Sequence, residues 1–116
     1  MPRAATTTDV FNAIAEPRRR QIIEVLARRG TLPVGALVIA IDLPQPAMSK
    51  HLGVLRKVGV VSMDKSGRQR VYRLNAQQLK SVYDWAKSFE HFWSHQLDRI
   101  KHRAEAKAHE RADASS

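Results

Sequence analysis

Polar side chains that can hydrogen-bond to nucleic-acid bases and phosphates gather in one short stretch of the sequence. Gln45, Ser49 and Lys50 alternate with the apolar residues Met48 and Leu52 at the spacing of a two-faced helix. An amide can bond adenine through two hydrogen bonds, and an ammonium group can bond guanine or a phosphate. The pattern predicts a helix whose apolar back docks on the protein and whose front enters the major groove of DNA.

The front of this helix is expected to carry further residues. His51 can read a base, donate to a phosphate or simply lie on the helix surface, and its polar neighbours favour contact with DNA. Arg56 and Lys57 lie near the end of the helix. The residues predicted to bind DNA from this helix are Gln45, Ala47, Ser49, Lys50, His51 and Arg56.

A second basic cluster follows, where the period of the sequence changes from helical to extended. The runs Val60–Asp64 and Arg68–Leu74 flank residues 65–67, which predicts a two-stranded hairpin with glycine in its turn. A protruding turn of this charge suits phosphate or minor-groove contact, and only Asp64 dilutes it. The residues predicted to bind DNA from the hairpin are Lys65, Arg68, Arg70 and Arg73.

The elements that must position these clusters are helices. A short first helix is predicted to begin at Thr8 or Asp9, both of which are good caps. Glu16 followed by Pro17 indicates the start of a second helix, because proline suits the first helical turn. Gly30 is expected to end the second helix in a left-handed cap.

The following residues complete a supersecondary motif. Pro33 is expected to open a third helix in its first turn, and Val34–Ile41 is apolar nearly all round, as in a helix buried between others. Asp42–Pro44 forms the turn, and Gly59 ends the fourth helix. Helix, short turn, helix and hairpin together predict a winged helix-turn-helix, mainly α, with about five helices and a two-stranded wing.

Beyond the hairpin, apolar residues recur at steps of three and four, which predicts one long helix from Leu79 to Ile100 that packs on another helix. The simplest partner is the same helix of a second copy, in a two-fold dimer. Phe89 and Trp93 could instead line a ligand pocket, although a dry seam is the commoner use of such spacing. The predicted interface comprises Phe11, Leu79, Val82, Tyr83, Ala86, Phe89, Trp93, Leu97 and Ile100.

The net charge indicates a polyanionic partner. The 116 residues carry 20 Lys and Arg against 11 Asp and Glu, a formal charge of +9. Such an excess attracts nucleic acid, an anionic membrane surface or an acidic protein. Arg18, Arg19 and Arg20 oppose the dipole of the second helix, which suggests either ion pairing within a dimer or a phosphate contact.

Several functional classes are excluded by residue type. The sequence has no cysteine, hence no disulfide, thiolate nucleophile or cysteine-based metal site. It has no glycine-rich phosphate loop, and Ser49 and His51 are two residues apart and cannot meet on a helix, so neither an enzyme nor a cofactor is expected. The longest apolar stretch falls well short of the roughly 20 residues that span a membrane. We therefore expect a cytoplasmic protein without membrane association.

From Val10 to Arg103 the sequence resembles the ArsR/SmtB family of small winged-helix repressors. Four stretches carry the resemblance, of which the second is the most specific: Ala15–Arg20, Leu43–Leu52, Val54–Val61 and Gly67–Leu74. The resemblance implies a homodimer joined through the first and last helices, sequence-specific binding to an operator in double-stranded DNA, and repression that an inducer relieves.

The positions of the family's known metal sites hold other residues in this sequence. Where thiol-based sensors of the family carry Cys-x-Cys-Asp-Leu, this sequence has residues 39–43, which include no cysteine. Where its zinc-type sensors carry Asp-x-His, Asp84 is followed by Trp85 and Ala86. His91 and His95 have metal-ligand spacing, but without a nearby carboxylate they are more often surface residues. No metal is predicted, and the effector stays open.

The predicted organisation is a flexible arm (residues 1–8), a DNA-binding and dimerisation domain (9–103) and a charged, fraying tail (104–116). The favoured function is a sequence-specific homodimeric repressor at an imperfect palindrome. Two alternatives stay open: a winged-helix module that binds an acidic protein, and a nonspecific nucleoid-type DNA binder.

Overall fold

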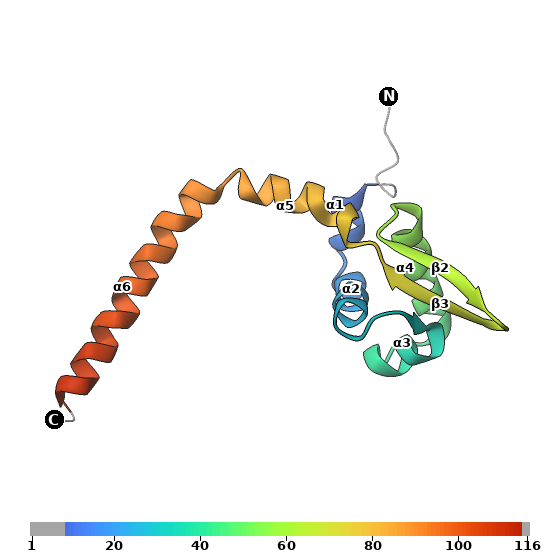
Figure 1. Ribbon diagram of the computed structural model, residues 1–116, viewed down its shortest axis with the longest axis horizontal. Coiled ribbons are helices and arrows are strands. Elements are labelled where there is room, and N and C mark those ends of the chain that lie inside the picture. Colours follow the sequence, from blue (N-terminus) through green and yellow to red (C-terminus); the bar gives the residue numbers. More distant parts are fainter. Residues whose placement is uncertain (1–8, 115–116) are drawn as a thin grey trace. The chain divides into compact units, whose positions relative to one another are not determined.

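The computed structural model describes the backbone of residues 9–114 and the side chains of residues 9–108. The chain divides into two compact units, with the boundary between Val82 and Tyr83 (Figure 1). The expected N-terminal arm, residues 1–8, lies outside the described residues. The elements of the first unit are α1 (Val10–Ile14), α2 (Pro17–Arg29), β1 (Leu32–Pro33), α3 (Val34–Ile41), α4 (Gln45–Lys57), β2 (Val61–Ser66), β3 (Gln69–Leu74) and the 3₁₀ helix η2 (Ala76–Leu79).

The predicted starts of the first two helices are confirmed. Asp9 caps α1, because its carboxylate accepts a hydrogen bond of 2.9 Å from the backbone N–H of Phe11. Glu16 caps α2 in the same way, with a 2.9 Å bond from the N–H of Arg18, and Pro17 occupies the first helical turn. The α1–α2 junction is therefore fixed by its own side chains.

The sheet has a third strand that the sequence did not predict. β1 pairs with β3, which also pairs with β2, so the antiparallel order is β1-β3-β2. Pro33 is the last residue of β1 and the N-cap of α3, so its expected place in the first turn of α3 was wrong. β1 lies at the edge of the sheet. Proline is tolerated there because it has no N–H to donate to a second neighbouring strand, as a residue of an inner strand must.

The wing is confirmed as a hairpin, with a tighter turn than predicted. β2 continues through Lys65 and Ser66, and the strands are joined by Gly67 and Arg68 alone. Gly67 has a φ of +64°, which primed hairpin turns require at this position. In Figure 1 the hairpin extends beyond the helices of the first unit.

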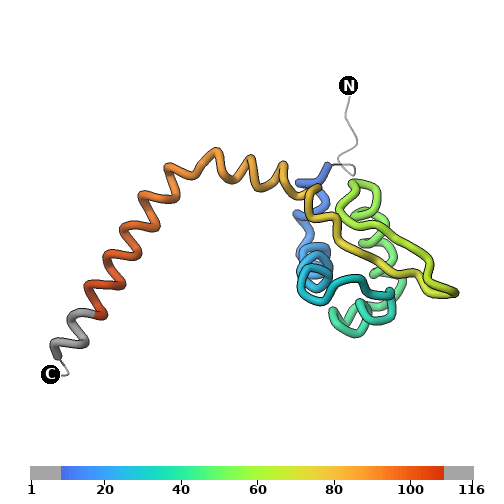
Figure 2. Tube along the Cα trace, in the orientation of Figure 1, coloured from blue at the N-terminus to red at the C-terminus, as the bar shows by residue number. Residues whose placement is uncertain are grey.

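The hydrophobic core holds α4 by its apolar face. Met48, Leu52 and Leu55 are 0%, 1% and 0% exposed. They pack in one cluster with residues of α2, α3 and the sheet, among them Ile22, Leu26, Leu37, Val61 and Tyr72. Figure 2 follows the chain from α3 through a short turn into α4 and on to the wing.

The single long C-terminal helix was a wrong prediction. Helix α5 (Lys80–Lys87) ends before helix α6 (Glu90–Ala114), so the residues described here form six α-helices where about five were expected. At the break, the Ser88 hydroxyl donates a 2.6 Å hydrogen bond to the carbonyl of Trp85. A serine bonded back to its own helix competes with the backbone ladder and favours a bend.

Two further expectations concern the two ends of the predicted C-terminal helix and its tail. Leu79, expected in the dimer seam, lies in η2 and packs half-buried against the core of the first unit. Helix α6 continues through the expected tail as far as Ala114. Fraying of that tail stays a prediction.

The buried face of α4 yields a test of the core. Leu52→Ala should lower the free energy of unfolding by about 2–5 kcal/mol, because it leaves a cavity at a fully buried position. Ile39→Ala, at a position 83% exposed, should change it by less than about 0.5 kcal/mol. Chemical denaturation measures both, and equal effects would contradict the packing described for α4.

Candidate nucleic-acid interface

The turn between α3 and α4 is short and sharply bent. Asp42 has a φ of 56° and is the one non-glycine residue of the described chain with a positive φ. Its N–H bonds to the carbonyl of Val38 at 2.9 Å, and the N–H of Leu43 reaches the same oxygen at 3.3 Å. Aspartate tolerates this left-handed conformation better than most residues, so the sequence suits the turn.

A polar stripe runs along the outward face of α4. Gln45, Ser49 and Arg56 are exposed at helical spacing and flank the buried residues, whereas the exposed Lys50 lies further round the helix, opposite them. Gly53 completes the stripe, and a Cβ added there would meet no atom within 4 Å. Sequence reasoning missed Gly53, although its spacing of four residues from Ser49 places it on this face. Ala47, also predicted on the front, is half-buried.

His51 points away from this stripe, toward the α1–α2 junction. Its Nε2 lies 3.6 Å from a carboxylate oxygen of Glu16, and its Nδ1 lies 3.4 Å from a guanidinium nitrogen of Arg19. The side chain is 18% exposed. Its expected contact with DNA stays a prediction.

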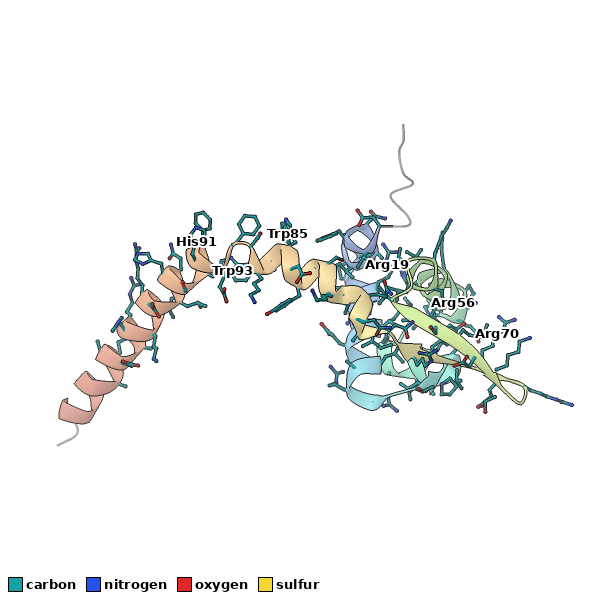
Figure 3. The ribbon with its side chains drawn as sticks, turned by 45° about the horizontal axis from the view of Figure 1, so that its top comes forward. Arg19, Arg56, Arg70, Trp85, His91 and Trp93 are labelled. Atoms are coloured by element: carbon teal, nitrogen blue, oxygen red, sulfur yellow. The ribbon has the colours of Figure 1, made fainter. Side chains whose placement is uncertain are left out.

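The wing concentrates positive charge at its tip. Lys65 and Arg70 are directly opposite one another across the two strands, and Arg68 lies in the turn. Like charges at opposed positions destabilise a hairpin, and no acidic side chain of the described residues pairs with them. Figure 3 shows Arg70 near the tip of the wing and Arg56 on α4. This charge indicates an anionic partner outside the chain.

Arg73 lies at the base of the wing and has partners within the chain. Its guanidinium bonds Asp64 at 3.4 Å and the side-chain oxygen of Asn75 at 2.7 Å. The amide of Asn75 in turn donates to the carbonyl of Gly59 and the hydroxyl of Ser62, at 3.1 and 2.6 Å. Sequence reasoning missed Asn75, which braces the wing against the end of α4.

A hollow separates the wing from the two helices of the motif. It has a volume of about 490 Å³ and opens between the start of α3, the start of α4 and the tip of β3. Polar groups from α4 and from the wing line this hollow. One of them belongs to Gln69, which the sequence analysis did not predict as a site residue. The lining residues are Pro33, Val34, Gly35, Ala36, Gln45, Arg68, Gln69 and Arg70.

Comparison with known proteins agrees with this geometry. A helix-turn-helix domain family matches residues 14–64. The chain is 40% identical to the HTH-type transcriptional regulator NmtR of Mycobacterium tuberculosis over 72% of its own length and 68% of that protein. It is 31% identical to the transcriptional repressor SdpR of Bacillus subtilis, over 70% and 89% of the two chains.

A solved structure of similar fold is the ArsR-like transcriptional regulator from Rhodococcus sp. RHA1. The TM-score is 0.65 at 27% identity, with 87% of this chain and 91% of that chain covered. The chain belongs to the ArsR/SmtB family. It is a DNA-binding transcriptional regulator of the helix-turn-helix type and not an enzyme.

The two histidines with metal-ligand spacing have other contacts in this chain. His95 accepts a hydrogen bond from Arg99 at 3.1 Å, and the ring of His91 lies 4.1 Å from that of Phe92. Within residues 9–108, no three His, Asp or Glu side chains lie close enough to hold a metal ion. Nor is any described helix long and apolar enough to cross a membrane.

The three arginines at the start of α2 have partners within the chain, and their expected ion pairing within a dimer or contact with phosphate stays a prediction. Arg19 and Arg20 donate to carbonyls at the end of α1, among them that of Ile14 at 2.7 Å from Arg20. Arg18 donates to the last carbonyl of α3, on Ile41, at 3.3 Å. The cations therefore complement the negative ends of neighbouring helices.

Large apolar side chains are exposed along α5, α6 and the two residues between these helices. Trp85 and Phe89 form an edge-to-face pair with ring centroids 5.4 Å apart. Trp85 and Trp93, which Figure 3 labels, are both exposed. Val82 and Ala86 are half-buried. The exposed predicted interface residues are Tyr83, Phe89, Trp93, Leu97, Ile100 and, on α1, Phe11.

The wing generates a test of electrostatic binding. Arg70→Ala should weaken binding to every duplex and reduce the slope of log affinity against log salt by about one, because one phosphate contact is lost. Arg99→Ala removes the same charge from α6 and should leave the slope unchanged. Titrations at several salt concentrations measure both, and an unchanged slope for Arg70→Ala would show that this residue does not contact phosphate.

Proposed function

We propose that this ArsR/SmtB member is a homodimeric repressor that binds an imperfect palindrome overlapping a promoter. The observation that carries the proposal is the exposed polar stripe on α4, which runs beside the buried face that docks on the core. Gln45 and Ser49 supply hydrogen-bonding groups, and Gly53 leaves room for close approach of a base edge. In this proposal α4 enters the major groove and Gln45, Ser49 and Lys50 contact bases.

The wing supplies the sequence-independent part of binding. Lys65, Arg68 and Arg70 carry charge that no described carboxylate neutralises, so they are available to phosphates beside the major groove. The hollow between wing and helices is large enough to receive part of a sugar-phosphate chain. Arg73 takes a lesser part in this proposal, because Asp64 and Asn75 already bind its guanidinium.

The exposed apolar surface of α5 and α6 supports the dimer. Leu97 and Ile100 are 61% and 60% exposed in the single chain, and Trp93 lies one helical turn before Leu97. A contiguous apolar face of this kind marks an association surface. Pairing with a second copy places two α4 helices on one side of the DNA, about 34 Å apart, in successive major grooves.

Repression then follows from occlusion of the promoter. The signal that would relieve it is left open, because the described residues contain no metal cluster and the exposed Ile39 is an isolated apolar contact point on α3.

Selection of bound fragments from a random duplex library, at moderate salt and with excess random competitor, tests the proposal. Recovery of an inverted repeat with half-sites about 10 bp apart is the expected result. Fragments without a common motif would instead favour a nonspecific nucleoid-type binder. No retention of DNA would favour a module that binds an acidic protein.

Base reading is tested on the selected operator. Gln45→Ala or Ser49→Ala should cost about 1–3 kcal/mol of binding free energy on the operator and little on random DNA. Gln77→Ala, an exposed glutamine of η2, is the matched control. Competition titrations measure the difference, and equal losses on both duplexes would contradict the assignment of base readers.

The dimer has its own test. Leu97→Glu should convert the dimer to a monomer, because association would bury an unpaired charge. His102→Glu adds the same charge on the opposite face of α6 and should leave the mass unchanged. Light scattering measures the mass of each variant, and a dimer that survives Leu97→Glu would place the interface elsewhere.

A further inference from the structure

The contacts of His51 suggest a role other than contact with DNA. Three elements meet at its ring: α4, which carries it, and α1 and α2, whose junction carries its partners. The carboxylate of Glu16 lies 3.6 Å from Nε2, and the guanidinium of Arg19 lies 3.4 Å from Nδ1. Both ring nitrogens therefore face charged groups of the same chain.

The two partners favour one state of the imidazole. A guanidinium can donate hydrogen bonds but cannot accept them, so the contact of Arg19 with Nδ1 is a hydrogen bond only in a ring whose Nδ1 is the acceptor. The ring proton then lies on Nε2, where it points to the carboxylate of Glu16. A neutral imidazole with this tautomer complements a cation on one side and an anion on the other.

The partners of His51 are themselves held in place. The second carboxylate oxygen of Glu16 accepts the N–H of Arg18 at 2.9 Å and so caps α2. Arg19 donates through Nε to the carbonyl of Ala13 and through Nη2 to that of Asn12, at the end of α1. A displacement of α1 or of the start of α2 therefore changes the contacts of a side chain on α4.

The same contacts oppose a role for His51 at the DNA surface. Its side chain is 18% exposed, whereas the neighbouring Ser49 and Lys50 are exposed. A carboxylate lies beside the nitrogen that would donate to a phosphate, and like charges repel. A ring held in this way has no free nitrogen with which to read a base.

We propose that His51 is a positioning residue, which locks the rotation of the recognition helix α4 against the α1–α2 junction through Glu16 and Arg19. The inference rests on the proposed function, because its readout is binding to the operator. It also gives α1, a predicted dimerisation helix, a direct connection to the helix that reads DNA.

A double-mutant cycle on the operator tests this role. Glu16→Gln keeps an oxygen to cap α2 but removes the charge that faces His51, and His51→Leu removes both ring nitrogens. Each single variant should weaken operator binding by about tenfold, and the double variant should be no weaker than the weaker single variant, because both remove the same contact. His51→Gln should restore most of the affinity, since its amide can donate to Glu16 from nearly the position of Nε2.

The base preference distinguishes positioning from reading. Affinities for duplexes substituted at each operator position should fall by a common factor in His51→Leu, and the salt slope should equal that of the wild-type protein. Additive losses in the cycle, a changed preference at one base pair, or a slope reduced by about one would each overturn the role for His51. Those results leave the proposed function intact if the wild-type protein still prefers its operator. A wild-type protein that does not discriminate the operator from random DNA would overturn the proposed function, and this inference with it.

Discussion

The burial of one face of α4 determines which of its side chains are exposed. Met48, Leu52 and Leu55 are almost completely inaccessible to solvent, and side chains leave a helix in fixed directions. Their burial leaves Gln45, Ser49, Gly53 and Arg56 exposed along the adjacent stripe of the helix. The exposed chemistry of α4 in this ArsR/SmtB member therefore depends on the packing of residues that lie in the core.

The positively charged side chains fall into two groups, those with partners within the chain and those without an acidic partner among the described residues. Cations that face other elements have partners within the chain: those at the start of α2 bond the carbonyl ends of α1 and α3, and Arg73 binds Asp64 and Asn75. Those at the tip of the wing, among them the opposed pair Lys65 and Arg70, have no acidic partner among the described residues. Repulsion between these like charges lowers the stability of the free protein, and in the proposed complex phosphates would relieve that repulsion.

The sequence predicted features that arise from local or periodic signals, and it missed those that arise from contacts distant along the chain. The helix starts at Asp9 and Glu16, the winged motif and the exposed stripe of α4 all follow from caps, glycines and hydrophobic spacing. Strand β1 has two residues and no periodicity, so only its pairing with β3 reveals it. The break at Ser88 depends on one hydroxyl bond, and the partners of His51 come from residues more than 30 positions earlier.

The placement of α4 and the wing on the operator is the central claim, and affinity cleavage tests it most directly. The sequence contains no cysteine, so a single cysteine introduced by Lys57→Cys or by Ser66→Cys can carry an iron chelate at one known place. The account predicts cuts from α4 at two sites about one helical turn apart, centred on the half-sites, and cuts from the wing at the flanking minor grooves. Uniform cleavage along the duplex from both positions, or cuts from the wing inside the half-sites, would contradict it.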